Sequence, residues 1–84
     1  MIGRLIWNQD RPDIAFATGM LYGGLHCGDC FAFYLDDHWI DVRLEYADDW
    51  VLIHNGHFVP VRYGILVSIY SVHKTCPSYN ERSN

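Results

Sequence analysis

The sequence lacks any apolar run that approaches the roughly 20 residues of a membrane-spanning helix, which argues against such a span. No window repeats its apolar residues with the 3.6-residue period of an amphipathic helix, so a helical bundle is disfavoured as well. Residues 1–7 lack the apolar segment and cleavage site of a secretory signal peptide. We therefore expect a cytoplasmic protein.

Basic residues are also scarce. Lys and Arg total 6 against 10 Asp and Glu, and the net charge of −4 argues against binding nucleic acid through its phosphates. Half of the residues are hydrophobic and 15% are aromatic, which is typical of a folded globular chain. A chain of 84 residues makes one small domain whose core alone gives marginal stability, and a structural metal is a common remedy.

The few cysteines fall into a pattern. Three cysteines and one histidine form two pairs, each with a two-residue spacer, in the order C-x2-C and then H-x2-C. Thiolate sulfur and imidazole nitrogen are the ligands that zinc takes in a tetrahedral structural site. The spacing therefore predicts one zinc ion bound by Cys27, Cys30, His73 and Cys76.

Alternatives to this site remain open. His26 is a rival fourth ligand because it precedes Cys27, although neighbours on an extended segment point apart. The cysteines could instead be small buried apolar residues without a metal. His54 and His57 flank a turn and could hold a second metal, but imidazoles at a turn are more often solvated.

Short apolar runs separated by turn signals predict an all-β fold. The expected strands cover residues 2–7, 13–17, 31–35, 38–46, 50–54, 57–63 and 65–73. We predict a small antiparallel SH3-like barrel of five to seven strands, with most aromatic side chains, including Tyr46, Trp50 and Tyr63, in its core. Zinc would staple the barrel where the last strand returns to residues 23–31, which hold three glycines and the first cysteine pair. This domain would cover residues 1–76, followed by a polar tail at 77–84.

Local signals fix several details of this fold. Asn-Gly at residues 55–56 is typical of a type I′ hairpin turn, and Asp-Asp at 36–37 predicts another tight turn. Pro60 places the strand over residues 57–63 at an edge of the sheet. The run at 65–73 is apolar enough to be a central strand.

Negative charge is concentrated in one window. Residues 36–49 carry a net charge of −5, and the rest of the chain carries +1. The acidic residues of the window are Asp36, Asp37, Asp41, Glu45, Asp48 and Asp49. Alternation along strand 38–46 puts Trp39 and the two central carboxylates on the solvent face. The conservative interpretation is a solvated strand face; the alternative is an acidic patch, anchored by Trp39, that docks on a basic partner.

The run Tyr-Gly-Gly-Leu-His-Cys-Gly-Asp-Cys-Phe at residues 22–31, followed by Trp39, 43–45 and 49–52, resembles an uncharacterised family of small domains. That family occurs in Gram-positive bacteria and on their phages and mobile elements. The resemblance covers most of residues 2–70 and implies no activity. By analogy of class, the chain resembles the short acidic inhibitors of host defence, and among these a small anti-CRISPR protein acting on a type II effector nuclease.

We therefore expect a non-enzymatic, zinc-containing protein, encoded by a phage or mobile element, that blocks a defence protein inside a bacterial host cell. Its acidic patch would occupy the positive channel in which a CRISPR effector holds its heteroduplex. One alternative is a zinc-ribbon-like adaptor in a bacterial regulatory complex. Another is a binder of a small molecule or nucleotide signal that uses Gly23 and Gly24, although the lysine and helix of a phosphate loop are missing. No catalytic residues are predicted.

Overall fold

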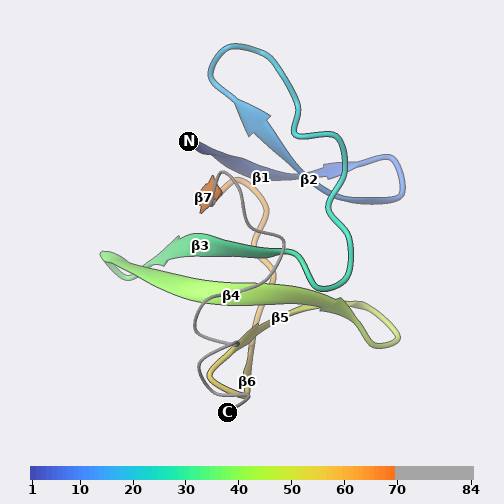
Figure 1. Cartoon of the computed structure of the whole chain (residues 1–84), viewed down its shortest axis with the longest axis vertical. Helices are drawn as coiled ribbons and strands as arrows, with labels where there is room; N and C mark the ends of the chain where they lie inside the picture. The colour runs from blue at the N-terminus through green and yellow to red at the C-terminus, as the bar shows by residue number, and fades with distance from the viewer. Residues whose placement is uncertain (70–84) are drawn as a thin grey trace.

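The computed structural model describes residues 1–69, which form seven β-strands and no helix. The strands are β1 (Ile2–Asn8), β2 (Arg11–Phe16), β3 (Cys30–Leu35), β4 (His38–Tyr46), β5 (Trp50–His54), β6 (His57–Val59) and β7 (Leu66–Ile69). All pair antiparallel in one sheet of order β2-β1-β7-β3-β4-β5-β6 (Figure 1). The predicted all-β class and strand number are confirmed. Residues 1–69 contain no helix that could cross a membrane.

The sequence predicts most accurately the strands that are bounded by tight turns. Strands β4 and β5 have the predicted bounds. The turn before β4 has positive φ at Asp36 (52°) and Asp37 (66°), and the turn after β5 has positive φ at Asn55 (51°) and Gly56 (79°). Two consecutive positive φ values match the right-handed twist of the flanking strands, so both hairpin predictions are confirmed.

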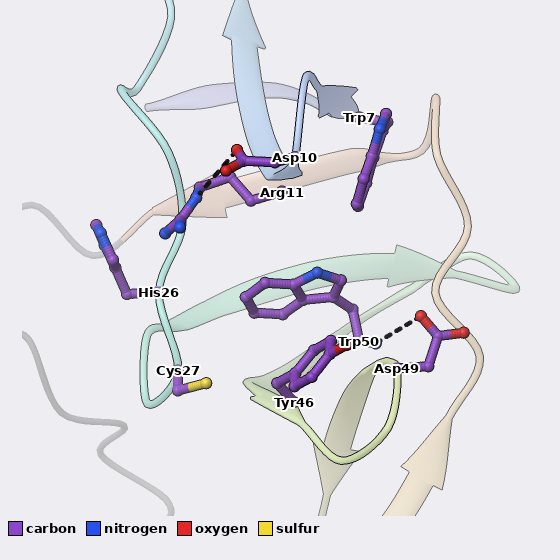
Figure 2. A pocket seen from close by; sticks show the side chains of 8 residues that line it. All are labelled: Trp7, Asp10, Arg11, His26, Cys27, Tyr46, Asp49 and Trp50. Carbon is purple, nitrogen blue, oxygen red and sulfur yellow. Dashed lines mark hydrogen bonds and ion pairs between the residues drawn. The ribbon is translucent and has the colours of Figure 1, made fainter.

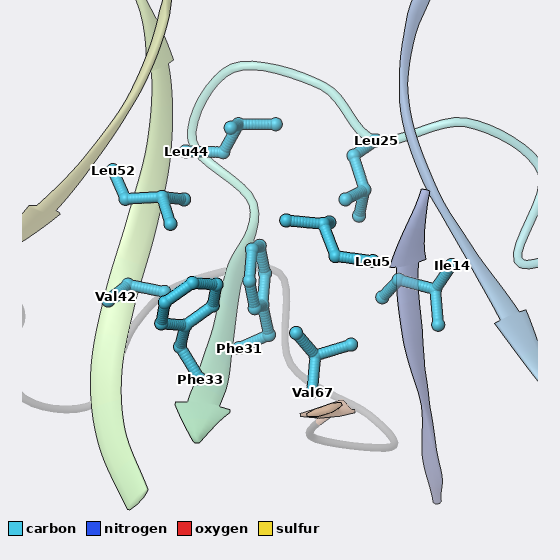
Figure 3. Packing of buried hydrophobic residues seen from close by; sticks show 9 residues of the cluster. All are labelled: Leu5, Ile14, Leu25, Phe31, Phe33, Val42, Leu44, Leu52 and Val67. Atoms are coloured by element: carbon cyan, nitrogen blue, oxygen red, sulfur yellow. The ribbon is translucent and has the colours of Figure 1, made fainter. Parts of the chain in front are cut away.

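One face of the sheet is buried along most of its strands. The core consists of Leu5, Ile14, Leu25, Phe31, Phe33, Val42, Leu44, Leu52 and Val67 (Figure 3). Because these residues come from six strands of a single sheet and from one connection, the sheet must curl around them. Burying each such side chain contributes about 1.5–3 kcal/mol. The predicted alternation in β4 is confirmed, since Val42 and Leu44 are fully buried while Trp39 is 44% exposed.

Strand β7 joins the two halves of the sheet. It pairs with β1 on one side and with β3 on the other, which confirms the prediction of a central last strand. The connection before β7 extends the first pairing: Leu5 donates its amide to the Ile65 carbonyl at 2.9 Å, and Gly64 donates to the Leu5 carbonyl at 2.6 Å.

The predicted closed SH3-like barrel is wrong for the described residues, because the two ends of the sheet, β2 and β6, do not pair. Strand β6 is short and ends directly before Pro60, which has no amide proton for a further ladder bond. The free edge of β2 is covered by its own chain. Tyr22 donates to the Ile14 carbonyl at 2.8 Å, and Leu25 donates to the Pro12 carbonyl at 2.9 Å.

The connection between β2 and β3 crosses from one half of the sheet to the other (Figure 1). We call residues 20–29 the glycine-rich segment. Its first part follows the edge of β2, and its last part pairs with β4, where Gly28 donates to the Leu44 carbonyl at 2.8 Å. Between these contacts, Leu25 enters the core and is 1% exposed.

A buried carboxylate shapes this segment. Asp13 is 0% exposed, and its Oδ1 accepts the amides of Ile14 (2.8 Å), Gly23 (3.0 Å) and Gly24 (2.8 Å). Its Oδ2 accepts the side-chain amide of Asn8 at 3.0 Å. Both glycines have positive φ, 111° and 98°, which other residues rarely adopt and which turns their two amides onto one oxygen.

The same contacts set the protonation state of Asp13. Burial removes the carboxylate from water and by itself raises the pKa. The four hydrogen bonds, led by that from Gly24, favour the ionised form and hold the pKa of Asp13 below its ordinary value of 3.8. The group is therefore a charged acceptor at neutral pH.

Asp13→Ala should lower the free energy of unfolding by at least about 3 kcal/mol, because it leaves several buried donors without their charged acceptor. Urea unfolding measures this loss. Asp10→Ala is the matched control: Asp10 lies in the same hairpin but its side chain is 79% exposed, so its loss should cost under about 1 kcal/mol. Equal costs for the two variants would contradict this role of Asp13.

Lowering the pH should reveal how much the Asp13 charge contributes to the free energy of unfolding. The pKa is lower in the folded state, so this contribution is complete above pH 3.8 and is lost as the pH falls through the folded-state value. Asp13→Asn removes the titrating group, so its unfolding free energy should fall less steeply than that of the parent below pH 3.8. Parallel curves in acid denaturation experiments would refute the assignment.

Candidate functional site

The first predicted cysteine pair lies on one tight turn. Cys27 is exposed and Cys30 is 7% exposed. The turn is held by Asp29, whose carboxylate accepts the His26 amide at 2.8 Å and whose own amide donates to the His26 carbonyl at 3.1 Å. The Cys30 thiol lies 3.5 Å from the Gly28 carbonyl.

The other two predicted zinc ligands, His73 and Cys76, lie outside the described residues. Among residues 1–69, no three His, Cys, Asp or Glu side chains are grouped so that they could hold a metal ion. The rival ligand His26 thus does not complete a three-ligand group with the two cysteines there; its Nδ1 lies 3.9 Å from Asp29 Oδ2.

Two other sequence alternatives involve residues that have structural partners. The amides of Gly23 and Gly24, which a phosphate cradle would need, donate to Asp13. His54 and His57 are opposite each other in the β5–β6 register, and His54 Nδ1 lies 2.7 Å from the Asp41 carbonyl oxygen. That contact ties the end of β5 to β4.

The acidic residues of the 36–49 window lie along β4 and in the turns at its two ends. Asp36 and Asp37 occupy the turn before β4, beside Trp39, whose ring centroid is 5.0 Å from that of Tyr34. Asp48 and Asp49 lie at the other end of β4, which is 9 residues long and so spans about 30 Å.

The middle of β4 is less acidic than its sequence suggests. Asp41, Arg43 and Glu45 are half-buried on the outer face. Arg43 Nε lies 2.7 Å from Glu45 Oε2, so the carboxylate of Glu45 is neutralised by an ion pair. Uncompensated negative charge therefore gathers at the two turns.

A cleft opens at the Asp48–Asp49 end of the sheet (Figure 2). It has a volume of about 660 Å³, within the usual range for ligand sites. The β1–β2 hairpin contributes Trp7, Asp10 and Arg11; the glycine-rich segment contributes His26 and Cys27; the β4–β5 hairpin contributes Tyr46, Asp49 and Trp50. The walls thus come from three distant parts of the chain.

The aromatic walls of the cleft continue the core face of the sheet. Trp7 has the same strand parity as buried Leu5, and Tyr46 has the parity of buried Leu44. At the strand ends this face meets solvent, so Trp7 is 49% and Tyr46 is 56% exposed. The prediction that Tyr46 and Tyr63 are core residues is wrong, since Tyr63 is also 45% exposed.

Each tryptophan of the cleft packs against a tyrosine. The ring centroids of Tyr46 and Trp50 are 5.0 Å apart at an interplanar angle of 65°, and those of Trp7 and Tyr63 are 6.0 Å apart at 75°. Both are edge-to-face arrangements, which aromatic rings prefer. These contacts fix the orientation of the indole rings.

Charge is distributed unevenly across the cleft. On one side, Arg11 Nε lies 3.5 Å from Asp10 Oδ1, and Arg11 Nη1 lies 3.4 Å from the Leu25 carbonyl oxygen. On the other side, Asp49 Oδ1 accepts the Trp50 amide at 2.8 Å. Burial and the nearby charge of Asp49 raise the pKa of the Tyr63 phenol above 10.0.

The fold and this cleft define a small all-β domain with an aromatic and acidic surface site. Residues 3–69 match a domain of unknown function, DUF5348, and the chain belongs to that family. The predicted relation to an uncharacterised family of small domains is confirmed at this level. A comparison with curated proteins found no significant match.

A solved structure shares the fold. It is the crystal structure of a protein from Ruminococcus gnavus, determined by the Northeast Structural Genomics Consortium. The two chains are 38% identical, with a TM-score of 0.72 over 82% of this chain and 100% of the other.

The proximity of Asp49 to Tyr63 can be tested by titration. Asp49→Asn removes a negative charge that disfavours the phenolate, so it should lower the pKa of Tyr63, while the effect of burial remains. A pH titration of the tyrosine ring carbons by NMR measures this shift. Asp36→Asn, at the far end of β4, should leave the pKa of Tyr63 unchanged, and an equal response to both variants would contradict the geometry.

Proposed function

We propose that this chain is a non-enzymatic binding domain that docks on a basic surface of a larger protein in a bacterial host cell. The observation that carries the proposal is the cleft end of the sheet. There Trp7, Tyr46 and Tyr63 are each about half exposed near the carboxylate of Asp49, and Asp48 is exposed in the same turn.

This composition is typical of a docking surface. Aromatic side chains are enriched at interfaces because they bury a large area at a small cost in conformational entropy. Carboxylates at the rim speed association with a basic partner and exclude acidic ones. The net charge of −4 favours the same class of partner.

A narrower proposal concerns the identity of the partner. The sequence resemblance supports a phage or mobile-element protein that inhibits host defence, most specifically an anti-CRISPR protein that keeps nucleic acid out of a type II effector nuclease. The basic channel of such an effector suits an acidic domain of this size. Trp39 on the outer face of β4, together with Asp36 and Asp37 in the turn before it, forms the second surface that could make this contact.

The proposal includes one structural zinc ion bound by Cys27, Cys30, His73 and Cys76. Its support is the placement of Cys27 in a tight turn and of Cys30 at the start of β3, with the positive φ of 90° at Gly28 turning the chain between them. Exposed Cys27 can meet a metal without rearrangement of the core.

Paired charge variants test the docking surface. Asp48→Asn/Asp49→Asn should slow association with a purified type II effector about tenfold at low salt and flatten its salt dependence. Asp36→Asn/Asp37→Asn is a matched control, with the same charge change in the other β4 turn, and should have a smaller effect. Asparagine tolerates the positive φ of three of these positions, so the fold should survive.

The outcomes separate the proposals. A larger loss in the Asp36/Asp37 variant would move the contact to the outer face of β4. Failure of the parent chain to bind or inhibit any type II effector would refute the anti-CRISPR proposal. Equal binding by the parent and both variants would refute docking through charge.

Metal analysis tests the zinc site. Protein purified under reducing conditions should contain about one zinc ion per chain, and a chelator should lower its melting temperature sharply. Cys27→Ser is the most informative variant, because its exposed side chain can be changed with little loss of packing. His73→Ala should release zinc more readily than His26→Ala. Metal-free protein with an unchanged melting curve would falsify the site.

A further inference from the structure

We infer that the cleft receives an arginine side chain from an extended segment of the partner, with the guanidinium stacked on an indole ring and paired with the carboxylate of Asp49. This inference rests on the proposed function and names the group that the binding surface recognises. It follows from the shape, the charge and the rigidity of the cleft.

Aromatic rings line two sides of the cleft. Figure 2 shows Trp7 on one side of the cleft and Trp50 with Tyr46 on the other. A guanidinium is planar and stacks on such rings, and its cation–π attraction is strongest with tryptophan. The volume of about 660 Å³ exceeds one side chain, so neighbouring residues of an extended segment also fit.

The charge favours a cation on one side only. Arg11 is the single guanidinium among the residues that line the cleft, and it is paired with Asp10. Asp49 lies at the opposite side of Trp50 from that pair (Figure 2). Adjacent Asp48 adds a second exposed carboxylate in the same turn. A guanidinium placed there would meet a carboxylate with the fork geometry that Arg matches best.

Other occupants satisfy fewer of these features. A nucleotide could stack its base on the indoles, but its phosphates would meet the carboxylates of Asp10 and Asp49. A neutral proline-rich segment could fill the aromatic walls but would leave Asp49 without a counter-ion. A lysine side chain lacks a planar group that can stack on an indole ring.

Contacts within the protein also hold the side chains of the cleft in place before a ligand binds. Tyr63 braces Trp7, and Tyr46 braces Trp50, through edge-to-face contacts. The Trp50 amide donates a hydrogen bond to Asp49 Oδ1 and so orients that carboxylate. Ordered side chains lose little freedom on binding, which raises the affinity for a small group.

NMR of the tryptophan indole N–H groups tests the inference with the intact chain. The probe is a blocked Gly-Arg-Gly tripeptide, and its control is the same tripeptide with citrulline, which keeps the shape of arginine without the charge. The resonances of Trp7 and Trp50 should shift with the arginine peptide. Trp39, on the outer face of β4, serves as an internal control and should not shift.

Substitutions test whether Asp49 is the counter-ion of the bound guanidinium. Asp49→Asn should raise the Kd of the arginine peptide about tenfold, and Asp36→Asn should leave it unchanged. Trp7→Ala should abolish the shift of Trp50, with the amide spectrum showing that the fold is kept; Trp7→Phe, which retains an aromatic ring, should restore part of the affinity.

Several results would overturn the inference. These are equal shifts with citrulline, equal shifts at Trp39, an unchanged Kd in Asp49→Asn, or stronger shifts with ATP or with a blocked tri-proline peptide. This peptide-binding experiment is independent of the assay for association with an effector nuclease. A cleft that binds the arginine peptide in a chain that docks on no basic protein would refute the proposed function alone, and docking without peptide binding would refute this inference alone.

Discussion

The structure depends on one buried charge, the carboxylate of Asp13. A carboxylate removed from water is costly unless hydrogen bonds replace its hydration, and here four hydrogen bonds do so. The same hydrogen bonds hold Gly23 and Gly24 against β2, so the chain leaves the first hairpin in a fixed direction. The glycine-rich segment can then cover the edge of β2, place Leu25 in the core and reach β4 at Leu44.

The core and the candidate binding surface are parts of one face. Alternate residues of β1, β4 and β5 run from the buried centre of the curled sheet to its open end, from Leu5 to Trp7 and from Leu44 to Tyr46. The same packing that stabilises the fold therefore positions the aromatic rings. The glycine-rich segment supplies the remaining wall, so the Asp13 network supports the cleft although it does not line it.

Local patterns predicted the parts of the fold that local chemistry determines. Strand β4 and both turns with paired positive φ follow from alternation and from the residues at the turns. Alternation, however, gives the side of a residue and not its depth, so Tyr46 was assigned correctly to the core face and wrongly to the interior. The open sheet was also missed, because no residue pattern indicated that residues 20–25 return along β2 and cover its edge.

The role of Asp13 and the cleft had only faint sequence signals. An aspartate between Pro12 and Ile14, inside a strand, is unusual and could have indicated a buried acceptor. Trp7 and Arg11 are far from Trp50 in sequence, and the pairing of β7 with both β1 and β3 helps to bring their elements together. No spacing rule describes such a site.

The central place of β7 has a consequence for the order in which the domain folds. The β1–β2 hairpin and the strands β3 to β6 are each built from neighbours in sequence, but the two halves share a sheet only through β7, the last strand described. During synthesis, both halves leave the ribosome with an unpaired edge that residues 66–69 later fill. Such non-local pairing is slow compared with hairpin formation. The nascent chain therefore passes through a stage in which the edges of β1 and β3 stay unpaired until residues 66–69 join them.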